Sequence, residues 1–470
     1  MSVTRQPSAR WNQSTLGEML TVIRGVSYKK EHASGEPGKG TLPILRATNI
    51  QDGLVFEDLI HVPKDYVSDE QMLRPGDIVI AASSGSRHIV GKAAQLTTDW
   101  QGSFGAFCFG LRPKPGIDSR FLAWFFQTSE YRNRVSELSA GVNINNLRAK
   151  HIEETPFRFP SPDDQRRIVA EIEKQFTRLE AGVAALRRVQ ANLKRYRAAV
   201  LKAACEGRLV PTEAELAKTG KRKAKFETGK ELLARILAER RKNWQGRGKY
   251  KEPAAPEPPA DVELPEGWVW TGFEQLADGT KNAIKAGPFG SSLKKSVYTR
   301  SGFKIYGQEQ VIRGDPYFGD YFISQELFEQ LQSCEVKPGD ILISLVGTTG
   351  KVLILPDDSA PGIINPRLLK LSLTRSGVNP KFIKILLESA TTRAFFKLAA
   401  HGGTMEILNL GILKTLPIAL PPLAEQTRIV AEVERRLSVV EELAAVVSAN
   451  LRRAVRLRQS VLQKAFTGEL

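Results

Sequence analysis

Two long stretches of this chain carry an apolar residue at every seventh position. Five consecutive heptads favour a coiled coil over a lone surface helix. At 1.5 Å per residue each helix should be roughly 60–70 Å long, and Gly207 and Gly468 are predicted to end them. The heptad positions are Ile172, Leu179, Leu186, Leu193 and Val200 in the first stretch and Val433, Val440, Val447, Ala454 and Val461 in the second.

A different pattern precedes each heptad stretch. Short β-branched and aromatic runs alternate with Gly, Pro, Asn and Asp, which is typical of strands and turns. The segments "PGDIVIAAS" and "PGDILISLV" each predict a turn followed by a buried strand. The segments "RFLAWFFQTSEYRNRVSEL" and "KFIKILLESATTRAFFKLA" predict amphipathic helices. The sequence therefore predicts two globular α+β units.

The chain is a tandem duplication. "DQRRIVAEIE" from Asp164 and "EQTRIVAEVE" from Glu425 agree at seven of ten positions, at an offset of 261 residues. The same offset relates Pro160 to Pro421 and Gly207 to Gly468. The pattern predicts globular units at 1–158 and 262–418, helical spacers at 159–209 and 419–470, and a connector at 210–261.

Each helical spacer has an apolar seam that the other could cover. An antiparallel pairing would place the two globular units at opposite ends of a rod, related by a pseudo-twofold axis. A parallel pairing is harder to connect, although the long connector could allow it. We therefore expect an antiparallel coiled coil, and we expect the nonpolar helix faces outside the seam to bind partners.

The connector has a mixed composition. "TEAELAKTGKRKAKFETG" is strongly charged, "KELLARILAERRKNW" predicts a short amphipathic helix, and "EPAAPEPPADVELPEG" predicts an extended proline-rich spacer. A solvated linker and an arm that contacts phosphates or a partner both remain open.

The charge of the chain suggests its binding partner. Lysine and arginine number 68 against 51 acidic residues, giving a net charge of +17, which favours a polyanion such as nucleic acid. A basic protein without such a partner, or one bound to anionic lipid, is the alternative. The sequence has neither an apolar run long enough to span a bilayer nor an apolar signal core, so we expect a cytoplasmic protein that does not bind membranes.

No catalytic motif is evident. "GTTGKV" at Gly347 lacks the spacing of a phosphate-binding loop, and it and "VGKAA" at Val90 instead predict hairpin turns with a lysine at the tip. Methyltransferase, serine-hydrolase and H-E-x-x-H motifs are missing. The three cysteines and five histidines are scattered, so we expect no disulfide framework and no metal site.

Several segments resemble one protein family. The helix starts "PPLAEQTRI" and "PSPDDQRRI", the two "PGDI" strands, the opening "LPEGWVW" and the ending "AFTGEL" resemble the DNA-specificity subunit of type I restriction-modification enzymes. The resemblance covers nearly all of the chain. The first copy departs from it slightly at 161–164, where "SPDD" replaces "PLAE".

This resemblance implies a function. The units at 1–158 and 262–418 would be target recognition domains, each contacting one half of a split site in double-stranded DNA, with the helices as spacer. Two modification subunits, which bind S-adenosylmethionine and methylate adenine, and two motor-nuclease restriction subunits would join the chain. ATP and Mg²⁺ would also belong to the partners, and the chain itself would hold no cofactor and catalyse nothing. An unrecognised methyltransferase and a structural DNA-binding spacer without sequence preference are the alternatives.

Candidate contact residues come from polar loops, because base edges are recognised by side chains with hydrogen-bond donors and acceptors. Lys92 and Lys351 are expected to contact phosphates, which set register rather than sequence. Gln165 and Gln426, at the helix starts, are candidates for partner binding. The predicted DNA contacts are Arg46, Asn49, Ser84, Arg87, Lys92, Asn143 and Asn145 in the first unit and Lys294, Lys295, Gln308, Gln310, Arg313, Thr348 and Lys351 in the second.

Overall fold

The structure of the chain is a computed structural model, and it divides into two compact units. Unit 1 comprises residues 1–188 and 447–470, and unit 2 comprises residues 189–446. Helices α5 (Pro162–Cys205) and α14 (Leu423–Thr467) contribute residues to both units. The structure describes residues 11–86, 88–138, 145–220, 226–244, 248–289, 292–346, 349–399 and 408–470.

The core of unit 1 is built on an antiparallel sheet with the strand order β2-β9-β5-β7. A second sheet has the order β4-β3-β8, in which β3 and β8 are parallel. Two short pairs, β1-β11 and β10-β6, complete the unit. The strands are β1 (Asn12–Thr15), β2 (Leu20–Arg24), β3 (Thr41–Leu45), β4 (Ile60–Pro63), β5 (Ile78–Ala81), β6 (Ser83–Ser84), β7 (Ala93–Gln95), β8 (Ser103–Phe104), β9 (Cys108–Pro113), β10 (Asn145–Asn146) and β11 (Pro156–Phe159).

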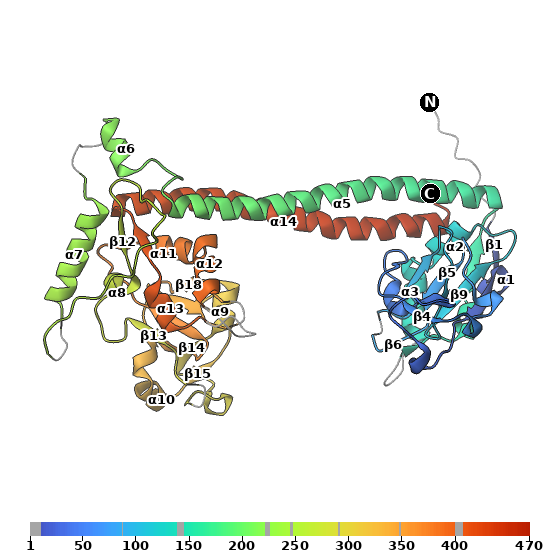
Figure 1. The fold of residues 1–470 in the computed structure, drawn as a ribbon, viewed down its shortest axis with the longest axis horizontal. Helices are drawn as coiled ribbons and strands as arrows, with labels where there is room; N and C mark the ends of the chain where they lie inside the picture. Colours follow the sequence, from blue (N-terminus) through green and yellow to red (C-terminus); the bar gives the residue numbers. More distant parts are fainter. Residues whose placement is uncertain are drawn as a thin grey trace. The chain divides into compact units, whose positions relative to one another are not determined.

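Four short helices accompany these sheets in unit 1 (Figure 1). Phe121 and Phe125 of α2 enter the same hydrophobic core as Ile78 and Ile80 of the sheet. The helices are α1 (Leu16–Met19), α2 (Ser119–Phe125), α3 (Ser129–Leu138) and α4 (Ala149–Glu153).

Unit 2 repeats this plan with altered details. Its main antiparallel sheet has the order β13-β20-β17-β18, a second sheet has the order β15-β14-β19-β16, and β12 pairs with β21. The strands are β12 (Val269–Thr271), β13 (Ile284–Ala286), β14 (Phe303–Tyr306), β15 (Phe322–Ile323), β16 (Glu335–Val336), β17 (Ile341–Ser344), β18 (Val352–Ile354), β19 (Gly362–Ile364), β20 (Leu368–Leu371) and β21 (Ile418–Leu420). The helices are α6 (Glu213–Lys218), α7 (Gly229–Lys242), α8 (Phe273–Leu276), α9 (Gln308–Arg313), α10 (Gln325–Gln330), α11 (Pro380–Leu387), α12 (Ala390–Ala399) and α13 (Leu410–Thr415).

The same turn leads into the central strand of each unit, as the sequence predicts. Gly76 and Gly339 have φ angles of 96° and 85°, in the left-handed region that glycine adopts without strain. The Asp77 carboxylate accepts a hydrogen bond from the Arg74 N–H at 2.9 Å, and Asp340 accepts the equivalent bond at 2.8 Å. The strands that follow, β5 and β17, are buried along their whole length.

The two long helices pack antiparallel within each unit. In unit 1 the start of α5 shares a core with the end of α14, through Ile172 and Phe176 on one side and Val461 and Leu462 on the other. In unit 2 the end of α5, at Val200 and Leu201, shares a core with the start of α14. All five predicted seam positions of α14 are buried, each less than 10% exposed. The α+β class and the antiparallel helix pair are confirmed (Figure 1).

Both helices end as the sequence predicts. Gly207 and Gly468 follow the last turns with φ angles of 67° and 80°. The Arg208 N–H donates to the Ala203 carbonyl and the Glu469 N–H donates to the Lys464 carbonyl, each at 2.9 Å. This bond across six residues, with glycine in the left-handed region, is the usual way to satisfy the last carbonyls of a helix.

One helix of the connector packs into the core of unit 2. Helix α7 forms where the amphipathic pattern predicts it, and Thr228 caps its first turn by accepting a hydrogen bond from Glu231 N–H. Leu232 and Ile236 are fully buried in the core of unit 2. Helix α7 is therefore a packed part of unit 2 and not a solvated linker.

Candidate nucleic-acid interface

Two predicted DNA-contact residues of unit 1 meet at a short strand pair. Ser84 of β6 lies opposite Asn145 of β10, although 60 residues separate them in the sequence. The Ser84 hydroxyl accepts a hydrogen bond from the Ser86 N–H at 3.1 Å. Phe107 lies beside this pair, because its carbonyl accepts hydrogen bonds from Ala82 and Ser83, and its side chain is 69% exposed. The sequence gives no signal for this exposed aromatic ring.

Asn49 is buried, whereas a direct base contact needs an exposed side chain. Its side chain is only 3% exposed. The carboxamide oxygen accepts from the Arg46 N–H at 2.9 Å, and the amide nitrogen donates to the carbonyls of Val55 and Glu57 at 3.0 and 2.8 Å. Arg46 in turn donates to the Asp58 carbonyl at 2.6 Å. These bonds hold the loop after β3.

Gln310 has the same role in unit 2. It lies 261 residues after Asn49 and is 1% exposed. Its carboxamide oxygen accepts from the Gly307 N–H at 2.9 Å, and its nitrogen donates to the Phe318 carbonyl at 2.7 Å. A base contact by Asn49 or Gln310 stays a prediction, but both amides already have backbone partners, so we assign them to loop positioning.

The paired lysines lie at hairpin loops. Strand β5 pairs with β7 and β17 pairs with β18, both antiparallel, and Lys92 and Lys351 directly precede the second strands. Their carbonyls accept from Ala81 and Ser344 N–H groups at 2.9 and 3.0 Å. The two lysines thus lie at the base of each hairpin rather than at its tip. Lys351 is exposed and Lys92 is half-buried.

Unit 2 gathers several predicted residues around one pocket of about 560 Å³. Lys295, Gln308 and Gln310 line it. Gln308 donates to the Val346 carbonyl, and Lys294 is exposed beside Lys295. Arg313, also exposed, stacks on Phe318 with its guanidinium carbon 4.0 Å from the ring centroid.

The pocket also contains residues that sequence reasoning missed. Tyr298 and Tyr321 lie edge to face with their ring centroids 6.0 Å apart, and Glu309, Asn365 and Arg367 also line the pocket. Tyr298 directly follows the turn that contains Lys295, whereas Tyr321, Asn365 and Arg367 lie beside β15, β19 and β20, and the sheet pairing brings these three near Lys295. Aromatic rings beside amide and guanidinium groups suit a surface that contacts bases and phosphates.

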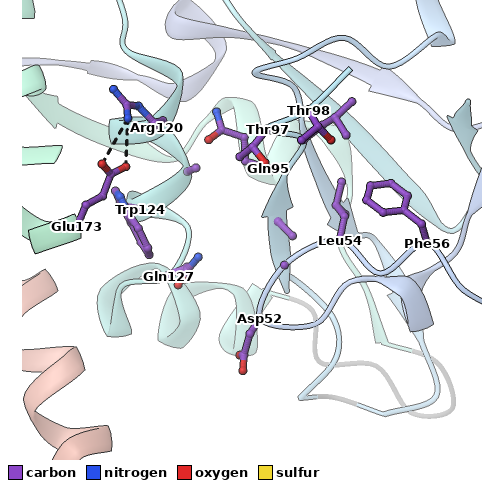
Figure 2. Close-up of a pocket in the computed structure, with 14 residues that line it drawn as sticks. Asp52, Leu54, Phe56, Gln95, Thr97, Thr98, Arg120, Trp124, Gln127 and Glu173 are labelled. Atoms are coloured by element: carbon purple, nitrogen blue, oxygen red, sulfur yellow. Dashed lines mark hydrogen bonds and ion pairs between the residues drawn. The ribbon is translucent and has the colours of Figure 1, made fainter. Parts of the chain in front are cut away.

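A second pocket, of about 310 Å³, lies in unit 1 between α2, β7 and the loop at 52–56 (Figure 2). Trp124 and Gln127 line it on the helical side. An ion pair at 3.3 Å joins Arg120 of α2 to Glu173 of α5 at its edge. None of the predicted contact residues lines this pocket.

The glutamines predicted to bind partners are fully buried. The Gln165 carboxamide oxygen accepts from the Asp118 N–H at 2.8 Å, and its nitrogen donates to the Pro160 carbonyl at 2.9 Å. Gln426 accepts from the Asn379 N–H at 2.9 Å and donates to the Pro421 carbonyl at 3.0 Å. Both are 0% exposed. Partner binding by their side chains stays a prediction, but in this structure they join each long helix to the N-cap residue of a domain helix.

Other parts of the long helices expose apolar side chains. Val439, Leu443 and Val446 of α14 are 47–52% exposed and follow the four- and three-residue steps that place side chains on one helix face. Val189 and Tyr196 of α5 are also exposed. We call Val439, Leu443 and Val446 the α14 stripe. Three predicted DNA contacts, Arg87, Asn143 and Thr348, lie outside the described residues. In the part of the chain that the structure describes, no helix is long and apolar enough to cross a membrane.

Comparison with known proteins places the chain in a family. The sequence model of the family described as Type I restriction modification DNA specificity domain matches residues 9–185 and 287–438. The EcoKI specificity subunit of Escherichia coli K12 is 29% identical over 479 residues, covering 100% of this chain and 91% of that protein. The StySPI specificity subunit of Salmonella potsdam is 28% identical, covering 98% and 89%.

A solved structure supports the fold. A chain from a study of complex assembly and conformational transition of the type I R-M system superposes with a TM-score of 0.64, covering 100% of both chains at 19% sequence identity. The family match spans more than half of the sequence and includes both copies of the duplication. The chain therefore belongs to the family of type I restriction-modification DNA specificity proteins.

Proposed function

We propose that this chain is the non-catalytic specificity subunit of a cytoplasmic type I restriction-modification complex and recognises a bipartite target in double-stranded DNA. Residues 1–158 and 262–418 are the two target recognition domains, 159–209 and 419–470 are the helical spacers, and 210–261 is the connector. The observation that carries the proposal is the duplication, because two equivalent domains with divergent polar loops suit two different half-sites.

The exposed polar loops are the proposed DNA surfaces. In the second domain they surround the pocket at Lys295 and Gln308, with Lys294, Arg313 and Lys351 exposed. In the first domain they surround the β6-β10 pair, with Ser84, Asn145 and the exposed ring of Phe107. Lysines at these loops supply sequence-independent phosphate contacts, and amide and guanidinium groups supply base contacts.

Catalysis belongs to partner subunits in this proposal. Two modification subunits, carrying S-adenosylmethionine, bind the helix pair, and the α14 stripe is their proposed contact. Exposed apolar side chains in a row on a helix commonly mark a protein interface. Two motor-nuclease subunits, with ATP and Mg²⁺, complete the restriction complex.

The direct test is to sequence DNA methylated by the assembled modification complex. The expected product is a split motif with modified adenines and a fixed gap of unspecified bases. A continuous motif, or methylation without sequence preference, would contradict the proposal. Purified chain without partners should neither methylate nor cut DNA.

A lengthened spacer tests the role of the helices. We would insert one heptad after Arg188 in α5 and one after Ala449 in α14, which are equivalent points at the 261-residue offset. A heptad preserves the seam and adds about 10 Å to each helix, so the gap should grow by roughly three base pairs. Three heptads, about 32 Å, approach one turn of DNA and should restore the facing of both half-sites.

The controls for this experiment are internal. Insertion into α5 alone should disrupt the helix pair and abolish activity. Both half-site sequences should stay unchanged in the double insertion, since neither domain is altered. An altered half-site with an unaltered gap would show that the helices do not set the spacing.

A further inference from the structure

One arginine of unit 1 joins three separate elements. Arg458 lies on α14, and its Nη1 pairs with Glu180 of α5 at 3.4 Å. Its Nη2 donates to the Gln127 carboxamide oxygen at 3.0 Å, and Gln127 lies in the turn after α2 of the globular domain. The guanidinium also lies over Phe176 of α5, 4.2 Å from the ring centroid. Arg458 thus binds the domain and both long helices together.

Unit 2 has an equivalent arginine. Arg197 of α5 pairs with Glu441 of α14 at 3.2 Å and with Glu388, the C-cap residue of domain helix α11, at 3.7 Å. Each of these residues lies 261 positions from its counterpart in unit 1. The counterparts are Arg197 and Arg458, Glu441 and Glu180, and Glu388 and Gln127.

The antiparallel pairing gives these contacts an unusual property. Arg458 belongs to the second copy of the sequence but holds the globular domain of the first copy, and Arg197 does the reverse. A different ion pair ties each domain to the helix of its own copy. These pairs are Arg120–Glu173 at 3.3 Å and Lys381–Glu434 at 2.8 Å. Each domain is therefore fixed to both helices.

We propose that Arg458 and Arg197 are positioning residues that fix the angle of each recognition domain on the helix pair and so restrict the gap between the half-sites. The inference rests on the proposed function. The hydrophobic core also packs each domain against both helices, and the arginine adds directional contacts that limit small rotations within this packing. Without those contacts the DNA surface would accept gaps of more than one length. Neither arginine belongs to the proposed DNA surfaces.

The two arginines differ in their chemistry, and this difference gives a sharp test. Arg458 uses the plane of its guanidinium, stacking on Phe176 while it donates to Gln127. A lysine keeps the charge but cannot reproduce that geometry. Arg197 forms ion pairs with two carboxylates, so a lysine should replace it well, and added salt should weaken these pairs.

The experiment uses the assembled modification complex and a series of duplexes. Each duplex carries both half-sites of the parent motif, with the gap shortened or lengthened by one or two base pairs. Binding is measured for the parent, Arg458→Ala, Arg458→Lys, Arg197→Ala and Arg197→Lys. Arg456→Ala, at an exposed arginine of the same helix, is the control.

In Arg458→Ala, discrimination against a gap changed by one base pair should fall about tenfold, since a hydrogen bond to a charged group contributes about one such factor. In Arg197→Ala, whose ion pairs are partly exposed, it should fall about two- to fivefold. Arg197→Lys should restore discrimination, and Arg458→Lys should not. Base substitutions within either half-site of the duplex should weaken binding of the variants as much as they weaken binding of the parent. Arg456→Ala should keep the discrimination of the parent.

Three outcomes would overturn the inference. Unchanged gap discrimination in both alanine variants would show that the arginines do not set the angle. An equal loss of binding to every gap length would show a merely structural role. If both lysine variants bind DNA, but Arg197→Lys does not restore gap discrimination and Arg458→Lys does, the contacts of the arginines do not determine that discrimination. A parent complex that accepts all gaps would instead contradict the proposed function itself.

Discussion

The starts of the two long helices occupy equivalent positions in the duplication but have different surroundings. At the start of α14, Glu425 is fully buried and accepts hydrogen bonds from the Trp268 indole N–H at 2.9 Å and the Glu213 N–H at 3.0 Å. At the start of α5, the equivalent residue is Asp164, which is half-exposed and pairs with Arg167 one turn further along.

The connector causes this difference. After Gly207 the chain passes over the start of α14, where Arg428 donates to the Pro211 carbonyl at 3.0 Å and pairs with the buried carboxylate of Glu213. In the described part of unit 1, no segment covers the start of α5. A pocket of about 490 Å³ lies there instead, beside Arg167 and Leu470.

The comparison explains why one copy departs from the family pattern. In "PPLAEQ" Pro422 and Glu425 are buried, whereas their counterparts in "PSPDDQ", Ser161 and Asp164, are exposed and half-exposed. At the first of these positions an apolar residue is buried in one copy, and a polar residue meets solvent in the other. The departure thus follows from the surroundings of the motif and leaves the helix start itself unchanged.

The largest expected difference between the two starts concerns their arginines. Arg428→Ala removes the ion pair with the carboxylate of Glu213, which is 1% exposed, and should destabilise unit 2 by about 3–5 kcal/mol. Arg167→Ala removes an exposed pair at 3.1 Å and should cost about 0.5 kcal/mol or less. Urea unfolding of both variants checks this, and equal effects would show that the connector does not stabilise α14.

The next prediction tests the packing of α7. Ile236→Ala creates a cavity in the core that α7 shares with unit 2 and should cost about 2–4 kcal/mol. Amide hydrogen exchange should rise in α7 and the neighbouring α8 but stay unchanged in unit 1. The exposed Lys242→Ala on the same helix is the control. Fast amide hydrogen exchange in α7 of the parent protein would contradict the packing of this helix into unit 2.

The sequence predicts the features that depend on local periodicity. The heptad seam, the glycine at each helix end and the turn before each central strand involve residues close together in the chain, and all three occur in the structure. Duplication strengthened each inference because every pattern appears twice.

The sequence did not predict which polar residues would be buried. Gln426 bonds to Asn379, 47 residues away, and Trp268 to Glu425, 157 residues away, so the folded chain alone creates these surroundings. A signal was nevertheless present. The Asn49–Gln310 and Gln165–Gln426 pairs share the 261-residue offset, and an amide repeated between otherwise divergent domains indicates a structural role.

That signal leads to a prediction in which the two units should agree. Gln165→Ala and Gln426→Ala each leave a buried backbone N–H and carbonyl without a partner, at a cost of about 1–3 kcal/mol. The two losses should be equal within error, as measured by urea unfolding. Gln175→Ala, which removes only a bond to Glu171 at the surface, is the control. Lost binding to modification subunits at unchanged stability would instead support a direct partner contact.

The smallest expected effect is a dependence on pH, and it belongs to the covered helix start. Burial raises the pKa of Glu425 above its ordinary value of 4.5, despite the hydrogen bonds that it accepts. Its protonated form is therefore favoured by folding, and the contribution to stability is fully present below pH 4.5 and is lost as the pH rises through the folded-state pKa. The unfolding free energy of the parent, measured relative to Glu425→Gln, should fall as the pH rises above 4.5.

Glu432, two turns along the same helix, provides the control for this prediction. Its hydrogen bonds with Arg435 and Arg436 lower its pKa to about 2, so its contribution is lost only as the pH falls from 4.5 toward that value. The difference between the parent and Glu432→Gln should therefore stay constant from pH 4.5 to about 7. A flat profile for Glu425→Gln as well would show that Glu425 is not held in an apolar site, and that the connector leaves the start of α14 as open to water as the start of α5.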